Sequence, residues 1–329
     1  MTLRTLRRSL ATLIAGGLAL SMAACTDSRD TAEDPAGGGE TRTVATKFGD
    51  IAVPAEPTKV VALGWGDAET ALALGVQPIG AADWLGFGED NDGVGPWAAG
   101  LYDESPEFFG TMELDTQAIG NLEPDLILDV RSSGDQDRYN ALKKIAPVVG
   151  VPEGGDNYLT TTEQQVTMIA RALGKEEEGK ALLKGVEDAF AQAAEDHPEF
   201  AGRTVTVSAY SSEGWGVYSE GDARVQFLEK LGFVQAPDVA AIESDNFFTP
   251  VSNEQLDLLD ADTMVSFPIF VDAGEIRGQA LYNALPAVKD GRAVLIDDLT
   301  LGNAFSIATT LGIEYAIEHI VPVLADTIR

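Results

Sequence analysis

The chain has 329 residues, of which 53 are Asp or Glu and 22 are Lys or Arg, so its net charge is −31 at pH 7. Phosphate backbones repel a protein this acidic, and no basic stretch offsets that repulsion, so nucleic acid is excluded as a partner. The single cysteine allows no intrachain disulfide, and the length exceeds one typical hydrophobic core. Two domains held together by packing are therefore expected.

Residues 1–24 have the layout of an export signal. Arginines open the segment, residues 10–20 are apolar, and two alanines precede Cys25. The apolar part is too short to span a bilayer as a mature helix. The ending resembles the lipobox of bacterial lipoproteins, although Met22 stands where leucine is usual. That resemblance implies cleavage after residue 24 and acylation of Cys25; the alternative is a plain cleaved signal with an incidental cysteine.

Residues 25–41 form the predicted tether between the lipid and the globular part. The segment is polar and contains three consecutive glycines, so it cannot bury enough apolar surface to offset the entropy of ordering. No later stretch approaches the length of a membrane-spanning helix. The globular part is expected to begin at residue 42.

The first half of the globular part alternates short apolar runs with helical patterns. Such runs, separated by helices, predict parallel strands that are covered on both faces. Asp67 is a plausible N-cap for the first of these helices. The predicted strands are 60–63, 78–82, 125–130 and 147–151, and the predicted helices are 67–74, 114–122, 139–145 and one that starts within 160–163 and ends at 173.

A longer helix is predicted for residues 175–198, where Pro198 stops it. Leu182, Val186 and Phe190 lie on one apolar stripe of this helix. At 1.5 Å per residue the helix would be roughly 35 Å long, enough to run along two domains. The alternation then resumes with predicted strands at 204–209, 263–267 and 293–296 and helices at 223–231, 253–259 and 306–324. The expected plan is an N-terminal lobe (42–174) and a C-terminal lobe (199–329) joined by this helix.

Five stretches together resemble a known family, the bacterial substrate-binding lipoproteins of ABC importers for iron–siderophores, haem and cobalamin. The stretches occur in the family's order, at residues 64–69, 122–128, 144–149, 252–256 and 285–292. The resemblance implies an α/β protein with two Rossmann-like lobes bridged by a single long α-helix, the helical-backbone periplasmic-binding-protein fold. It also implies a ferric siderophore as the ligand and an ABC permease dimer as the partner.

The resemblance further implies one carboxylate on each lobe that docks on arginines of the permease. The family position lies seven residues before the proline of a Pro-Asp pair. Counted back from Pro124 in the first lobe, it holds Gln117, which lacks the charge. In the second lobe Ala261 takes the place of the proline, and the position holds Glu254. Asp115, Glu113 and Glu69 are alternative carriers of the charge in the first lobe. Glu254 could also be an ordinary solvated acid at a helix start.

Ligands of two-lobed α/β proteins bind beyond the carboxyl ends of the strands. Aromatic side chains there can stack on a chelator, and arginines can neutralise an anionic iron complex. Each aromatic residue could instead be an ordinary packing residue at a lobe edge. The candidate ligand-binding residues are Trp65, Trp84, Arg131, Tyr210, Trp215, Tyr218, Arg224, Phe270, Arg277, Asn303 and Phe305.

An enzyme is not expected, because the two histidines lie in no catalytic motif and no phosphate-binding loop is present. Capture of a bare metal ion needs about three converging ligands, which two isolated histidines do not favour. Haem or cobalamin carriage in the same fold stays open. The sequence therefore predicts a monomeric, extracytoplasmic, lipid-anchored binding protein without a resident cofactor, whose iron is held by a siderophore of catecholate, hydroxamate or citrate type.

Overall fold

The computed structural model describes residues 40–110, 114–242 and 246–328. Residues 39–329 form one compact unit. The predicted signal and the Cys25 lipidation site lie outside the described residues. Within the described ranges, no helix has both the length and the apolar character needed to cross a bilayer.

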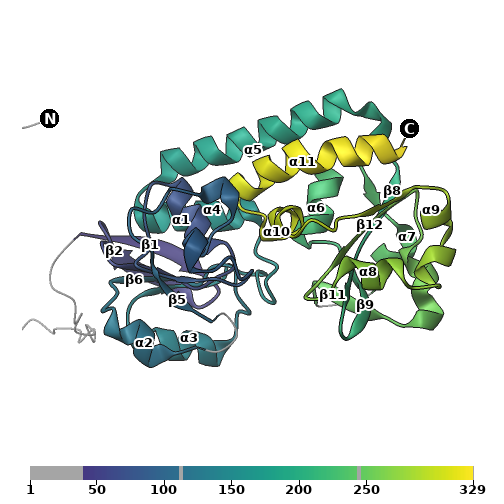
Figure 1. Ribbon diagram of the computed structural model, residues 1–329. Helices are drawn as coiled ribbons and strands as arrows, with labels where there is room; N and C mark the ends of the chain where they lie inside the picture. Colours follow the sequence, from purple (N-terminus) through teal and green to yellow (C-terminus); the bar gives the residue numbers. More distant parts are fainter. Residues whose placement is uncertain (1–39, 111–113, 243–245, 329) are drawn as a thin grey trace, which may run out of the picture. The chain divides into compact units, whose positions relative to one another are not determined.

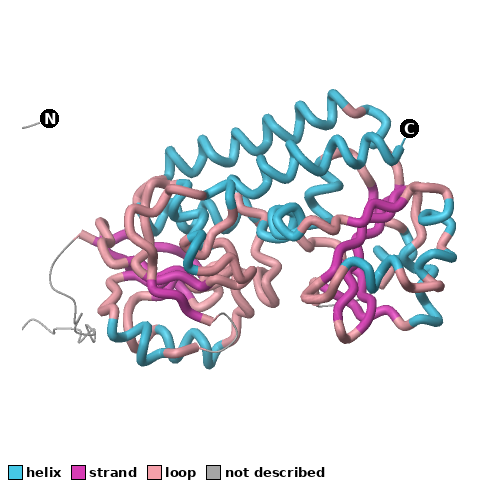
Figure 2. Tube along the Cα trace, viewed as in Figure 1, coloured by secondary structure: helices cyan, strands magenta, loops and turns pink. Residues whose placement is uncertain are grey.

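The N-terminal half is built on a parallel five-stranded sheet (Figures 1 and 2). Its strand order is β5-β4-β3-β6-β7, and a separate antiparallel hairpin, β1–β2, precedes it. Thr41, the last residue of the predicted tether, begins this hairpin. The strands are β1 (Thr41–Thr46), β2 (Gly49–Pro54), β3 (Val60–Ala62), β4 (Gly80–Ala82), β5 (Glu107–Phe109), β6 (Leu126–Leu128) and β7 (Val148–Val149).

The apolar runs reflect burial on both faces of this sheet. Val60 and Ala62 pack in the cluster that includes Ile169 of α4, whereas Val61 packs in the cluster that includes Leu142 of α3. Because successive side chains point to opposite faces, a strand covered on both sides must be apolar throughout. The helices are α1 (Asp67–Ala73), α2 (Thr116–Asn121), α3 (Gln136–Leu142) and α4 (Thr162–Leu173), with short 3₁₀ turns at Glu89–Asn91 and Pro96–Ala98.

The predicted bridging helix is α5 (Glu176–Asp196). It contacts α4 from the N-terminal half, α6 from the C-terminal half, and α11 along its side (Figure 1). Val186, Phe190 and Ala193 form its buried stripe and pack in the core of the C-terminal half. The same helix therefore packs on both halves, as the sequence predicted.

The C-terminal half contains a mixed sheet in the order β11-β9-β8-β12-β13, with β10 also paired to β8. Strands β8, β10, β12 and β13 are parallel, and β9 and β11 add an antiparallel edge. The strands are β8 (Thr204–Ser211), β9 (Gly214–Tyr218), β10 (Val234–Gln235), β11 (Phe248–Val251), β12 (Thr263–Pro268) and β13 (Ala293–Leu295). The helices are α6 (Ala223–Lys230), α7 (Pro237–Ala240), α8 (Ala273–Arg277), α9 (Pro286–Lys289), α10 (Leu299–Ile307) and α11 (Thr310–Ile328), with 3₁₀ turns at Pro198–Phe200, Asn253–Leu259 and Tyr282–Ala284.

The two halves share one local device that links neighbouring parallel strands. The Asp125 carboxylate, just before β6, accepts hydrogen bonds from the backbone N–H groups of Thr58 and Lys59, which lead into β3. Asp262, just before β12, accepts from the backbone N–H and the hydroxyl of Thr204 at the start of β8. In both sheets a carboxylate thus satisfies donors where two adjacent parallel strands begin.

Three local predictions were wrong. The predicted closing helix 306–324 is two helices, because Ala308 takes a left-handed conformation (φ 51°) between α10 and α11. Asp67 is not an N-cap; Gly66 holds that position, and the Asp67 side chain faces inward. Trp215 and Tyr218 lie on β9 itself, which was missed because Gly214 and Gly216 interrupt its apolar residues.

Two glycines of α5 provide a matched test of this packing. A Cβ on Gly179 would lie 2.6 Å from the Ala170 Cβ of α4, whereas a Cβ on exposed Gly185 would meet only Glu314 at 3.7 Å. Gly179→Ala should therefore lower the free energy of unfolding by about 1–3 kcal/mol through overpacking. Gly185→Ala should raise it by about 0.5–1 kcal/mol, because alanine favours the helix. Denaturant unfolding of both variants checks the pair, and equal shifts of the same sign would contradict the close helix contact.

Candidate functional site

Three aromatic rings form a stack beyond the strand ends of the N-terminal sheet. Trp65, between β3 and α1, lies between Trp84, which follows β4, and Tyr158, in the loop after β7. The Trp65 and Trp84 ring centroids are 4.2 Å apart with an interplanar angle of 6°, and those of Trp65 and Tyr158 are 3.9 Å apart at 21°. All three side chains are only partly buried. The loops after β3, β4 and β7 thus supply one stack of three aromatic rings.

The C-terminal half closes against this stack through Phe247, just before β11. The Phe247 ring meets Trp65 edge-on at 6.2 Å and Tyr158 at 6.4 Å. Its centroid lies 6.3 Å from that of Tyr218, at the end of β9. The aromatic cluster, defined here as Trp65, Trp84, Tyr158, Phe247 and Tyr218, therefore receives rings from both halves.

The cavity at the aromatic cluster is small, about 20 Å³. Its lining combines both halves: Trp65, Arg131, Tyr158, Thr160 and Thr161 from one, and Gly221, Asp222, Ala223, Arg224, Gln226, Phe247 and Ser306 from the other. A single water requires about 10–15 Å³ of such space. The rings therefore fill most of the space between the halves here, and a larger ligand must displace at least one of them.

Two indole N–H groups at this site are buried without a hydrogen-bond acceptor. Within the described part of the chain, neither the Trp65 Nε1 nor the Trp84 Nε1 has a partner. Buried donors are almost always paired, and indole N–H can only donate. The pair of orphan donors is typical of a place where an external acceptor, such as a ligand oxygen, completes the site.

Arg224 on α6 is held in the cavity wall by its own N-cap residue. Asp222 accepts the backbone N–H of Arg224, and the Arg224 Nη1 lies 2.9 Å from the Asp222 Oδ2. The Arg224 Nε donates to the Ser306 hydroxyl at 3.1 Å, and its guanidinium carbon lies 4.3 Å from the Tyr218 ring centre. Both charged side chains are only 8% exposed. They form a buried, internally neutral pair.

Arg131, which follows β6, forms its hydrogen bonds with other parts of the protein. Its Nε donates to the Thr160 carbonyl and its Nη1 to the Ile307 carbonyl, both at 2.9 Å. Its Nη2 lies 3.4 Å from the Thr162 hydroxyl, and the residue is 4% exposed. Burial lowers the pKa of Arg131 to about 10, and the nearby Asp67 carboxylate acts against that shift. The bond to Ile307 ties the N-terminal half to the end of α10.

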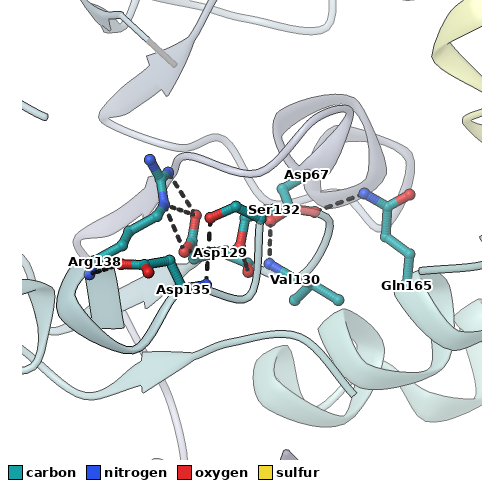
Figure 3. A network of polar contacts seen from close by, with 8 residues as sticks. Asp67, Asp129, Val130, Ser132, Asp135, Arg138 and Gln165 are labelled. Atoms are coloured by element: carbon teal, nitrogen blue, oxygen red, sulfur yellow. Dashed lines mark hydrogen bonds and ion pairs between the residues drawn. The ribbon is translucent and has the colours of Figure 1, made fainter. Parts of the chain in front are cut away.

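A network of buried acids lies behind the strand ends (Figure 3). The Asp67 carboxylate accepts the Val130 backbone N–H at 2.7 Å and the Gln165 amide at 2.6 Å. Asp129 forms an ion pair with Arg138 at 2.7 Å and accepts the Ser132 hydroxyl. Burial raises the pKa of Asp67 to about 6, although the bond from Gln165 lowers it. These contacts fix the loop that carries Arg131.

Several predicted binding residues lie away from the aromatic cluster. Trp215 is 3% exposed, stacks on Tyr282 and donates to Gln279, and Tyr210 packs beside it in the same core. Phe305 is 1% exposed and packs against Phe227 in the core under α5. These side chains are covered by their own lobe, so the structure gives Trp215 and Phe305 packing contacts in place of an accessible surface.

The other candidates lie on the surface of the C-terminal half. Phe270 is 95% exposed, and Asn303 on α10 is partly buried. Arg277 on α8 is more than half exposed and forms an ion pair with Asp297. The structure therefore gathers Trp65, Trp84, Arg131, Tyr218 and Arg224 from the predicted set and leaves Tyr210, Phe270, Arg277 and Asn303 outside the described cluster.

Sequence reasoning missed Tyr158, Phe247 and Asp222. Tyr158 follows β7, so the rule that selects residues beyond strand ends could have found it. Phe247 precedes the unpredicted strand β11 and carries no such signal. Asp222 precedes the predicted helix α6 and could have been identified as its N-cap.

The three predicted docking residues divide into two groups. Glu254 and Gln117 are both exposed, each in the first turn of a short helix. Glu69 is a correction: it is 2% exposed and accepts hydrogen bonds from the Trp97 indole at 2.8 Å and the Thr309 hydroxyl at 2.7 Å. Burial raises the pKa of Glu69, against the bond from Thr309. Its carboxylate is enclosed and cannot reach a partner protein.

Metal ligands do not converge in the part of the chain that the structure describes, where no three His, Cys, Asp or Glu side chains are placed to hold an ion. A second cavity of about 450 Å³ lies against α5 and shares the lining residues Thr161, Ala223 and Gln226 with the small cavity at the aromatic cluster. It is lined by α5, α6, the start of α4 and the α10–α11 junction. The aromatic cluster is therefore the candidate site.

Comparisons with known proteins identify relatives of this chain. A family model described as periplasmic binding protein matches residues 60–299. The probable siderophore-binding lipoprotein YfiY of Bacillus subtilis (strain 168) is 27% identical over 295 residues, covering 84% of this chain and 87% of that protein. The Fe(3+)-citrate-binding protein YfmC of the same organism is 27% identical over 77% of each chain. The structure of PiaA from Streptococcus pneumoniae TIGR4 in complex with ferrichrome is 27% identical, has a TM-score of 0.75, and is matched over 87% of this chain and 98% of that one.

The buried Asp67 predicts a distinct pH dependence of stability. Because its folded-state pKa of about 6 lies above the ordinary value of 3.8, the protonated group stabilises the fold at low pH, and this contribution is lost as the pH rises through 6. Between pH 4 and pH 7 the wild type should lose roughly 2 kcal/mol of unfolding free energy relative to Asp67→Asn. Denaturant unfolding at several pH values measures this difference.

Asp262→Asn is the control of opposite sign. The pKa of Asp262 is lowered, first by the bond from the Thr204 backbone, so ionised Asp262 stabilises the fold above its ordinary pKa. The advantage of the wild type over this variant should grow as the pH rises. A wild type and Asp67→Asn variant with parallel pH profiles would show that Asp67 does not titrate as described.

Proposed function

The chain belongs to the periplasmic binding protein family, and we propose from this premise that it captures a ferric siderophore and delivers it to an ABC importer. The ligand lies between the two halves, against the aromatic cluster. The protein acts outside the cytoplasm as a monomer, anchored to a membrane by a lipid on Cys25. It performs no catalysis, and the iron is cargo held by the siderophore.

The observation that carries this proposal is the aromatic stack with its orphan donors. Trp84, Trp65 and Tyr158 stack face to face, so the outer faces of Trp84 and Tyr158 are the ones not covered within the stack, and the two indole N–H groups lack acceptors among the described residues. A ferric chelate offers a complementary surface, because its iron-bound oxygens keep lone pairs that can accept hydrogen bonds and its organic framework can pack against aromatic rings. Stacking and hydrogen bonds to those oxygens together hold such a ligand without a direct bond from protein to metal.

The relatives support the same class of ligand. YfiY is named as a siderophore-binding lipoprotein, YfmC as an Fe(3+)-citrate-binding protein, and PiaA was solved with ferrichrome. The three proteins bind chemically different iron ligands at nearly equal identity to this chain. Their names therefore support ferric chelates as a class and leave the chelating chemistry to the site itself.

Tryptophan fluorescence tests the binding step directly. The soluble part, residues 41–329, is titrated with ferrichrome, ferric citrate, a ferric tricatecholate, haem and cobalamin. At least one ferric chelate should quench the emission, because its entry must displace a ring that now contacts Trp65. A response to haem or cobalamin alone, or to none of the five, would overturn the proposed ligand class.

Two tryptophan variants separate the site from the core. Trp65→Leu should weaken binding of the responding chelate by about fivefold to tenfold, because it removes a stacked ring worth roughly 1 kcal/mol. Trp215→Phe should change the affinity less than twofold and act on stability, since Trp215 packs in the core of the C-terminal half. Weaker binding in Trp215→Phe than in Trp65→Leu would place the ligand elsewhere.

Delivery requires surfaces other than the aromatic cluster. We assign docking to exposed Glu254 on one half and Gln117 on the other, where glutamine can hydrogen-bond an arginine without charge assistance. In cells, Glu254→Ala should lower iron uptake while the purified protein keeps its affinity. Cys25→Ser should release the protein from membranes and leave binding unchanged. Normal uptake in Glu254→Ala, or membrane retention of Cys25→Ser with unchanged mass, would contradict the respective claim.

A further inference from the structure

The charges at the strand ends do not form an anion-binding site. Of the cations that the structure places there, Arg224 is the one that lines the cavity and carries an ion pair with a buried carboxylate. Asp222 holds it through two contacts of the guanidinium, at 2.9 and 3.2 Å, and both side chains are nearly inaccessible. The pair has no net charge. A ligand in contact with Arg224 meets the negative field of Asp222 at almost the same distance.

Arg131 cannot supply the missing positive charge by reorientation. Each of its three guanidinium nitrogens already faces a carbonyl or hydroxyl oxygen, from Thr160, Ile307 and Thr162. Turning the side chain toward a ligand would leave two buried carbonyls without donors, at a cost that exceeds the gain from one new bond. It would also release the tie between the N-terminal half and α10.

The remaining arginines near the strand ends are neutralised in the same way. Arg138 contacts both oxygens of Asp129. Arg277 forms an ion pair with Asp297. Across the described ranges, every arginine that follows a strand end is thus bonded to a carboxylate or to protein oxygens, and Asp67 adds a further buried acid beside Arg131.

The groups left to meet the ligand are uncharged. They are the outer faces of Trp84 and Tyr158, the two indole N–H donors, and the hydroxyl groups of the cavity lining. Dipolar donors recognise ligand oxygens without requiring a net charge on the ligand. The field of the whole protein acts in the same direction, because a chain with a net charge of −31 repels anions before they reach the site.

We propose that the cleft selects ferric chelates without net negative charge and rejects polyanionic ones, with the Asp222–Arg224 pair as the specificity determinant. This inference rests on the proposed function and specifies its substrate class. A ferric complex of three hydroxamates is uncharged, because each hydroxamate carries one negative charge. A ferric complex of three catecholates is a trianion, and ferric citrate is also anionic. The predicted substrate is therefore of the neutral or cationic hydroxamate type.

The wild-type protein provides the first test. Ferrichrome should bind at least tenfold more tightly than ferric citrate or a ferric tricatecholate at low salt, a difference of about 1.4 kcal/mol. Added salt should leave ferrichrome binding nearly constant and should strengthen the residual binding of the anions, because it screens repulsion. Equal or tighter binding of an anionic chelate would overturn this inference and leave the proposed function intact. Failure of every ferric chelate to bind would remove the proposed function itself.

Two isosteric variants test the role of the pair. Asp222→Asn keeps the oxygen that caps α6 but leaves Arg224 with an uncompensated charge. The ratio of ferrichrome affinity to ferric citrate affinity should fall by about tenfold, as expected for one charge removed at a distance of ~10 Å from the ligand. Asp298→Asn makes the same charge change at the exposed N-cap of α10, where the structure gives the carboxylate a backbone partner, Leu301. That ratio should change less than twofold.

The melting temperature of each variant shows whether it is folded before affinities are compared. An unchanged ratio in folded Asp222→Asn, or an equal fall in Asp298→Asn, would show that the buried pair does not set the selectivity. If Asp222→Asn does not fold, Arg224→Gln provides the second readout. The ratio of ferrichrome affinity to ferric citrate affinity should rise by about tenfold in that variant, because Asp222 is then an uncompensated negative charge, and an unchanged ratio would show that the pair does not set the selectivity.

Discussion

The placement of the two halves depends on hydrogen bonds between the N-terminal half and the junction of α10 and α11. Arg131 donates to the Ile307 carbonyl, the Thr162 hydroxyl donates to the Ala308 carbonyl at 2.8 Å, and Glu69 accepts from the Thr309 hydroxyl. Ala308 adopts a left-handed conformation there, so the chain turns sharply at the point that is held. These bonds fix Ser306, and with it Arg224, relative to Trp65 on the other half.

These hydrogen bonds involve buried charged side chains, whose removal from water costs free energy. Glu69, Asp67 and Arg131 are each less than 5% exposed, and desolvation shifts the pKa of each toward its neutral form. Buried ionic groups give little net stability compared with apolar packing, but their hydrogen bonds demand one geometry. We interpret these residues as fixing one arrangement of the two halves, in which rings from both meet at the aromatic cluster. The second link between the halves, α5, packs closely on α4 through Gly179.

The two halves share a local motif, but the sheets that surround it differ. Asp125 and Asp262 occupy equivalent places in the two sheets. Each accepts the backbone N–H of a threonine, Thr58 or Thr204, near the start of the adjacent parallel strand. The surroundings then differ, since the N-terminal sheet is wholly parallel and the C-terminal sheet continues into the antiparallel strands β9 and β11. That extension places Tyr218 and Phe247 opposite Trp65. The aromatic cluster is thus a product of the difference between the halves.

The sequence by itself determined the features that depend on neighbouring residues. The apolar runs at β3, β6, β8 and β12, the stripe on α5 and the aromatic residues beyond strand ends are all local patterns, and they led to two α/β lobes with a site between them. Only the tertiary structure decided what each polar side chain does. The residue type and position of Glu69 fit a surface acid, and those of Arg131 and Arg277 fit cleft cations. Yet Glu69 is enclosed by Trp97 and Thr309, Arg131 is bound to distant carbonyls, and Arg277 is paired with Asp297. The partners of these groups come from segments up to 240 residues away, so no local pattern could reveal whether a charge is free or neutralised.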